Sequence, residues 1–90
     1  MICGYYFEVI KWVDAYGVGS SWYEINDFSI SNHYCFSVGW VVKENEESIV
    51  ICPHISPEND EIESNRNGCG EMTIPKSAIV SRKKLKVSKK

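Results

Sequence analysis

The segment from His33 to Lys43 reads HYCFSVGWVVK and carries the strongest strand pattern in the chain. Large apolar side chains occupy every second position, and most positions between them are small or polar. Because neighbouring side chains of a β-strand point to opposite faces, this alternation indicates a half-buried strand. We expect its buried face to carry the even-numbered residues, which are Tyr34, Phe36, Val38, Trp40 and Val42.

A second strand pattern, SIVICPHI from Ser48 to Ile55, follows a polar stretch that reads KENEE. A turn near Asn45 and Glu46 predicts a hairpin in which even residues of the first strand face odd residues of the second. The two apolar faces then coincide. The other face of this hairpin is poor in charge, since it carries Cys35, Gly39, Val41, Val50 and Cys52. A face of this kind is unusual for a monomer, so we expect another subunit to cover it, with the chain's own short helix as the alternative.

Three further strands are predicted around this hairpin. They are Tyr5–Val13, Glu71–Pro75 and Ile79–Val87. Ser21 and Glu24 have the spacing of a capping box, which predicts a helix of one or two turns. The set of elements indicates an all-β fold with one short helix. We expect a small five-stranded SH3-like or Sm-like barrel, or a curled antiparallel sheet.

The connections between these strands are also readable. Pro75 presets a single helical or 3₁₀ turn through Ala78, because its ring fixes φ. Ser56–Gly70 is polar and rich in turn residues, which predicts a long exposed loop. No linker or internal repeat divides the chain, so residues 1–85 are interpreted as a single β-rich domain and residues 86–90 as a basic tail.

Charge and composition restrict the classes of partner. The 90 residues carry a net charge of −2, with an acidic stretch from Glu44 to Glu63 and a basic one from Lys76 to Lys90. A balance of this sign makes nucleic acid an unlikely general partner. The first residues lack the pattern of a signal peptide, and no apolar run is long enough for a membrane helix. We therefore expect a cytoplasmic protein with reduced cysteines and no membrane partner.

The sequence offers no defensible catalytic or metal site. His33-x-Cys35 and Cys52-x-His54 contain the donors of a zinc site, but in the expected register Cys35 faces Ser56 and Cys52 faces Gly39, so the donors do not converge. No cysteine has both a neighbouring base and an orienting group, as nucleophilic catalysis requires. We expect a protein that is not an enzyme, with no catalytic residues, no metal and no cofactor.

A ligand site could combine aromatic and polar side chains from two regions. Trp22 and Tyr23 lie beside a flexible Gly/Ser loop and could stack on a base, while Asp14 could accept from a base or a ribose hydroxyl. Cationic Lys76 and Arg82 could neutralise phosphate. With Ser77, the candidate ligand-binding residues are Asp14, Trp22, Tyr23, Lys76, Ser77 and Arg82.

Three motifs are similar to short uncharacterised proteins of bacteriophages and prophages. They are Trp12-Val13-Asp14, Ser37-Val38-Gly39-Trp40 and the stretch GEMTIPKSAIV from Gly70 to Val80. The resemblance spans about Val9 to Leu85 and implies an anti-defence role in the cytoplasm of a bacterial host. The function expected is a homo-oligomer that binds and sequesters a small nucleotide-like immune signal without catalysis. The alternative is a protein–protein inhibitor or adaptor that acts on a host defence or CRISPR protein.

Overall fold

The computed structural model describes residues 4–17, 21–57 and 66–86 of the chain. Predictions about Cys3, about the acidic residues from 58 to 63 and about the tail from 87 to 90 lie outside these residues. The described part is mostly β-strand, as the sequence predicts.

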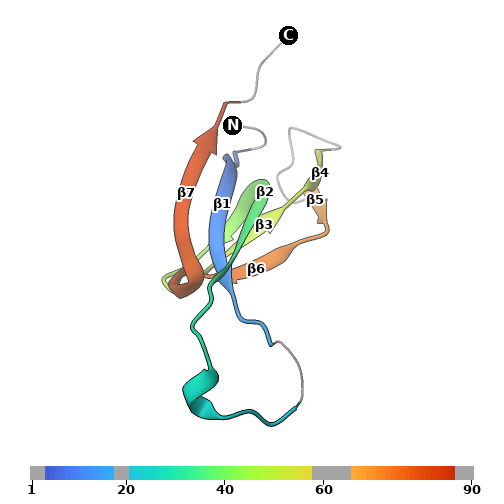
Figure 1. Cartoon of the computed structure of the whole chain (residues 1–90). Coiled ribbons are helices and arrows are strands. Elements are labelled where there is room, and N and C mark those ends of the chain that lie inside the picture. The colour runs from blue at the N-terminus through green and yellow to red at the C-terminus, as the bar shows by residue number, and fades with distance from the viewer. Residues whose placement is uncertain (1–3, 18–20, 58–65, 87–90) are drawn as a thin grey trace.

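Five strands form one antiparallel sheet, and two short strands form a second (Figure 1). The first sheet has the order β6-β3-β2-β1-β7, and its strands are β1 (Phe7–Asp14), β2 (His33–Glu44), β3 (Ser48–Cys52), β6 (Met72–Pro75) and β7 (Ile79–Leu85). The second pairs β4 (His54–Pro57) with β5 (Arg66–Cys69). The bounds of β1, β2, β6 and β7 agree with the sequence-based ones to within two residues, whereas β3 ends three residues before the predicted strand Ser48–Ile55. The predicted loop Ser56–Gly70 was wrong in part, because both of its ends are strands.

The long strand β2 bends and is shared by two halves of the sheet. Residues 33–40 pair with β1, and residues 40–44 pair with β3. The register shifts between Val41 and Lys43, which leaves Val42 as a bulge residue. Figure 1 shows β3 and β6 running across the direction of β1 and β7. The core lies where the halves meet, and its buried residues are Ile10, Ile49, Ile51 and Ile74.

The prediction for the buried face of β2 was wrong. Val41 lies opposite Ile51 and packs against the core, whereas Phe36 is 68% exposed and Tyr34 and Val38 are also exposed. The cause is the bend, because it brings the inner face of β2 close to other strands. A Cβ on Gly39 would lie 3.1 Å from the carbonyl oxygen of Cys52. The inner face of a strand this tightly bent requires small residues, and large ones remain outside.

The bulge also changes the predicted pairing of the hairpin. Cys52 lies opposite Trp40 rather than opposite Gly39, and Val41 lies opposite Ile51. The turn itself forms where expected, and the side-chain Oδ1 of Asn45 accepts from the backbone N–H groups of Glu47 and Ser48 at 2.9 and 2.8 Å. A one-residue bulge in a strand exchanges the inner and outer faces of the residues before it relative to those after it. The turn position was therefore predicted correctly, but the inner face of β2 before the bulge was not.

Pro53 lies in the connection between β3 and β4, and Gly70 lies in the connection between β5 and β6, next to Pro53. Pro53 ends β3, and Gly70 has a positive φ of 79° between β5 and β6. A Cβ on Gly70 would lie 3.1 Å from Pro53 Cγ, so the two corners are packed together. The predicted continuous strand Ser48–Ile55 is therefore two strands, and the β4–β5 hairpin leaves the main sheet as a separate ribbon.

The predicted short helix is replaced by a 3₁₀ turn. The described residues contain no α-helix, and η1 (Ile25–Asp27) begins after Glu24 rather than after Ser21. Glu24 makes no side-chain capping bond. Every residue from 21 to 32 is exposed, so no burial of an apolar helix face offsets the cost of nucleating a helix. By contrast, η3 (Lys76–Ala78) forms after Pro75 as predicted.

Candidate functional site

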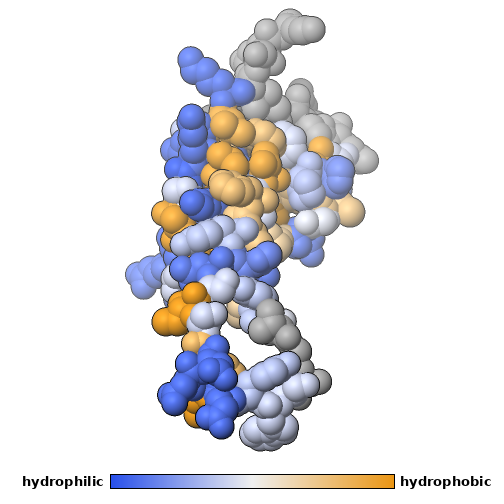
Figure 2. Space-filling view, viewed as in Figure 1, coloured by the Kyte–Doolittle hydropathy of each residue, from blue (hydrophilic) through white to orange (hydrophobic). Residues whose placement is uncertain are grey.

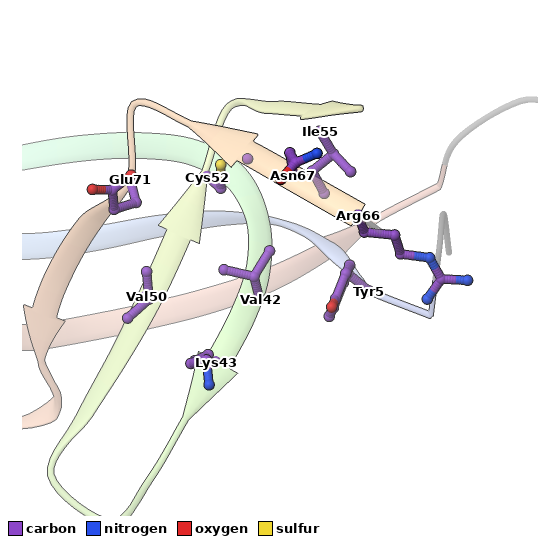
Figure 3. Close-up of a pocket in the computed structure, with 10 residues that line it drawn as sticks. Tyr5, Val42, Lys43, Val50, Cys52, Ile55, Arg66, Asn67 and Glu71 are labelled. Carbon is purple, nitrogen blue, oxygen red and sulfur yellow. The ribbon is translucent and has the colours of Figure 1, made fainter. Parts of the chain in front are cut away.

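A pocket of about 370 Å³ lies between β3 and the β4–β5 hairpin (Figure 3). Its apolar walls come from neighbouring strands and include Val42, Val50 and Ile55. Cys52 closes the wall next to β5, and its Sγ donates to the carbonyl oxygens of His54 at 3.0 Å and Cys69 at 3.3 Å. Those bonds hold the hairpin against β3, so the pocket is part of the fold rather than a gap in a loop.

Polar groups stand around the rim of this pocket. Figure 3 shows Tyr5 and Arg66 at one end and Glu71 at the other, with Lys43 between them. An apolar interior with a few polar groups at its edge is the usual form of a small-molecule site. At this rim Lys43 can attract an anionic group, and Glu71 can accept from a hydrogen-bond donor. None of these residues was singled out from the sequence.

Trp22 and Tyr23 lie in a projecting segment, residues 21–32, that we call the arm (Figure 1). The hydroxyl of Tyr16 donates to Ser31 Oγ at 2.7 Å, and the rings of Tyr16 and His33 lie 5.1 Å apart. These contacts join the two legs of the arm where it leaves the sheet. Trp22 itself is 100% exposed. The two aromatic residues are therefore accessible, but they face no cation in the described structure.

Lys76 and Arg82 are brought together, but around carboxylates. Arg82 donates from Nε and Nη2 to Glu8 at 2.9 and 3.0 Å and from Nη1 and Nη2 to Glu44 at 3.1 Å. Lys76 Nζ lies 2.7 Å from Glu44 Oε2. We call Glu8, Glu44, Lys76 and Arg82 the ionic cluster. Its two cations already hold two anions, so the cluster has no net charge with which to attract a phosphate.

The ionic cluster shifts the titration of its members. The hydrogen bonds from Arg82, and then from Lys76, lower the pKa of Glu44 from its usual 4.5 to about 2. The bonds to Glu8 and Glu44 raise the pKa of Arg82 above its usual value. Both shifts stabilise the charged forms, as expected for groups whose partners lie within hydrogen-bond distance.

The other two candidate residues lie apart from the ionic cluster. Asp14 ends β1 and pairs with His33 at the base of the arm, and Ser77 is an exposed residue of η3. The six candidates thus fall into the arm and its base, with Asp14, Trp22 and Tyr23, and the region of the ionic cluster, with Lys76, Ser77 and Arg82. The described structure brings no more than three of them to one place.

The outer face of β1 and β2 carries a third surface, which Figure 2 shows as an apolar area over these strands. Cross-strand pairs cover it, and they are Val9 with Val38, Lys11 with Phe36, and Val13 with Tyr34. Lys11 Nζ lies 4.7 Å from the centre of the Tyr34 ring and 5.8 Å from that of Phe36. We call these six residues the outer face.

The described residues contain no group of three His, Cys, Asp or Glu side chains that could hold a metal ion. His33 lies at the base of the arm and His54 on β4, both exposed. Cys35, Cys52 and Cys69 are free thiols. In the same part of the chain, no helix is long and apolar enough to cross a membrane.

Comparison of the chain with protein-family models, with curated proteins and with solved structures finds no match.

Sequence reasoning missed Glu8, the one charged residue that is buried in the described structure. A signal for it was present, because Glu8 stands two residues before Ile10 and four before Trp12, on the face that both bury. A carboxylate on a buried face needs a cationic partner. No comparable signal marks Arg66 as a pocket residue, since it stands in a polar stretch.

Proposed function

We propose that this protein captures a small anionic molecule of nucleotide type and releases it unchanged. The pocket between β3 and the β4–β5 hairpin is the observation that supports this proposal. Its volume, about 370 Å³, falls within the range of small-molecule sites. Its combination of an apolar floor, a phenol ring and the cation of Lys43 suits a ligand with a flat ring at one end and a phosphate at the other.

Each part of such a ligand has a complementary group in the pocket. Val42 and Val50 provide an apolar floor for a base, and the ring of Tyr5 provides a surface for stacking. Lys43 is the group for the phosphate, since charge-assisted hydrogen bonds are the stronger ones. The carboxylate of Glu71 can accept from an amino group or a hydroxyl at the opposite end.

Binding without turnover is the simplest chemistry for this site. A hydrolytic site would need a nucleophile, a base and an orienting group within hydrogen-bond reach of each other. Among the described residues, the pocket lining contains no histidine, and its cysteine donates to two backbone carbonyls. These observations support a role as a binder.

Titration calorimetry with mononucleotides and cyclic dinucleotides tests this proposal. We expect at least one of these ligands to bind. Lys43→Ala should lower the affinity for that ligand by about tenfold, the usual effect of losing a charge-assisted hydrogen bond. Val50→Trp should block the pocket, and Lys86→Ala is the control. Mass spectrometry of the recovered ligand should show it intact. If no nucleotide binds, or if Lys43→Ala binds equally well, the site is wrong.

The resemblance to short phage proteins supplies a biological setting for such a binder. In that setting the ligand would be a nucleotide signal of host immunity, and the protein would be an anti-defence factor in the host cytoplasm. The architecture supports a related proposal about the fold. A meander with its last strand beside its first, and a 3₁₀ turn before the last strand, suits an opened SH3-like barrel. No pairing between β6 and β7 closes it among the described residues.

A protein partner is the second candidate, in which the chain acts as an inhibitor or adaptor of a host defence or CRISPR protein. The exposed apolar arm is the observation that favours it, because exposed apolar clusters mark protein-binding surfaces. In a titration against one purified host protein, Trp22→Ser should abolish the complex and Val50→Trp should leave it intact. The reverse pattern would favour the pocket.

A further inference from the structure

The arm exposes five large apolar side chains to solvent. Trp22 is 100% and Ile30 98% exposed, and Tyr23, Ile25 and Phe28 are also exposed. Hydrogen bonds inside the arm are few, the backbone ones being Asp27 N to Glu24 O and Phe28 N to Ile25 O, both at 3.0 Å. Exposed apolar patches of this kind usually mark an interaction site.

The arm cannot reach the outer face of its own chain in the conformation described. Asp14 and His33 form the last pair of the β1–β2 ladder, and Tyr16 is hydrogen-bonded to Ser31 just beyond it. Those contacts carry the arm onward past the end of the sheet, as Figure 1 shows. The outer face lies on β1 and β2, the strands that the arm connects, and the arm extends away from it. An occupant for either surface must therefore come from another molecule.

Charges on the two surfaces are complementary. The arm carries Glu24 and Asp27, and the sequence has no Lys or Arg between Asp14 and Val42. On the outer face Lys11 lies over the rings of Tyr34 and Phe36, and Lys83 lies beside Val9 on the next strand. The described positions of β1, β2 and β7 on this face include no acidic residue.

We propose that the arm of one copy lies on the outer face of a second copy, and that the second arm returns the contact. Both surfaces belong to the same chain, so a two-fold dimer buries each of them twice, as an isologous interface requires. Trp22 and Ile30 supply apolar anchors for the surface around Phe36 and Val38, and the acids of the arm pair with Lys11 and Lys83. This dimer is independent of the ligand pocket, whose lining shares no residue with the arm or the outer face.

A charge-reversal experiment separates this dimer from other assemblies. One variant carries Lys11→Glu and Lys83→Glu, and the other carries Glu24→Lys and Asp27→Lys. In each variant alone, arm and outer face have the same sign of charge. In an equimolar mixture, each arm meets an outer face of opposite sign, and both contacts of the dimer are restored.

Sedimentation velocity at protein concentrations from about 1 to about 200 µM measures the dimerisation of each sample. We expect the wild type to dimerise, each variant alone to weaken the dimer at least tenfold, and the mixture to recover a 1:1 dimer. Lys86→Glu and Glu46→Lys are controls with charge changes on neither surface. A wild type that stays monomeric at every concentration overturns the proposal, and so does a mixture no stronger than its components.

Trp22→Ser provides a second test that does not depend on charge. The side chain is fully exposed, so its loss should leave the circular dichroism and thermal midpoint of the dilute protein unchanged. We expect dimerisation to weaken at least tenfold. Dimerisation equal to that of the wild type would show that another surface joins the copies.

Discussion

Arg82 holds Glu8 with two hydrogen bonds, from Nε at 2.9 Å and from Nη2 at 3.0 Å, and so joins the last strand to the first. Glu8 is 3% exposed, and no other charged residue is buried in the described structure. The same guanidinium reaches Glu44 at the end of β2, and Lys76 reaches it from η3. The ionic cluster therefore connects β7, at one edge of the sheet, with the end of β2 and with η3, which follows the other edge strand β6.

Replacing Arg82 with Met should lower the free energy of unfolding by about 3 kcal/mol, because it leaves the carboxylate of Glu8 buried without its partner. Arg82→Lys should recover only part of this loss, since an ammonium group cannot make the paired bonds of a guanidinium. Urea unfolding measures both, with Lys86→Met as the control. Equal stability of Arg82→Met and wild type would show that the pair does not matter to the fold.

Acid should weaken the ionic cluster through Glu44. Its pKa is lowered in the folded state, from 4.5 to about 2, so it takes up protons more readily when unfolded. Its contribution to stability is therefore complete above about pH 5 and is lost as the pH falls from 4.5 towards 2. The Glu44 side chain is 40% exposed, and solvent screening limits this contribution to about 1 kcal/mol or less.

Thermal unfolding of wild type and Glu44→Gln between pH 2 and pH 7 checks this contribution. The wild type should be more stable at pH 7, and the difference should disappear near pH 2. A constant difference across the whole range would exclude Glu44 as the titrating group. Arg82 stays charged throughout this range and should add no pH dependence of its own.

The sequence predicted the positions of most strands well, because alternation and turn residues are local properties. The β2–β3 turn, β6 and the 3₁₀ turn after Pro75 all lie where their patterns place them. The inner face of β2 could not be predicted in the same way. It depends on the bulge at Val42 and on the approach of Gly39 to Cys52, and both are set by strands that meet in space.

Less of the candidate site was predictable, because the roles of its charges depend on distant contacts. Lys76 and Arg82 suggested a phosphate site from the sequence alone. Glu8 lies 74 positions from Arg82 along the chain, and nothing local reveals that they meet. The pocket has the same origin, since Tyr5, Lys43 and Arg66 come together only when the β4–β5 hairpin folds against β3.

Two valines on opposite faces of β2 offer a direct check of the inner face. Val41 packs against the core and Val38 is 47% exposed. Val41→Ala should therefore cost about 1.5 kcal/mol in unfolding free energy, and Val38→Ala less than about 0.5 kcal/mol. Chemical unfolding should be measured on dilute protein, so that association does not contribute. A larger loss of unfolding free energy for Val38→Ala than for Val41→Ala would show that the even-numbered residues form the inner face, as the alternation in the sequence predicts.

Gly68 lies so close to Cys52 that a methyl group there should loosen the β4–β5 hairpin. A Cβ at this position would lie 2.7 Å from Cys52 Sγ, well inside contact distance. We expect Gly68→Ala to lower the free energy of unfolding by about 1–3 kcal/mol, the usual effect of overpacking. It should also weaken the binding of any ligand in the pocket. In the Cys52→Ala background the sulfur is gone, so the same substitution should cost much less. A double-mutant cycle on unfolding free energies measures this coupling, and additive effects would mean that the two residues do not touch.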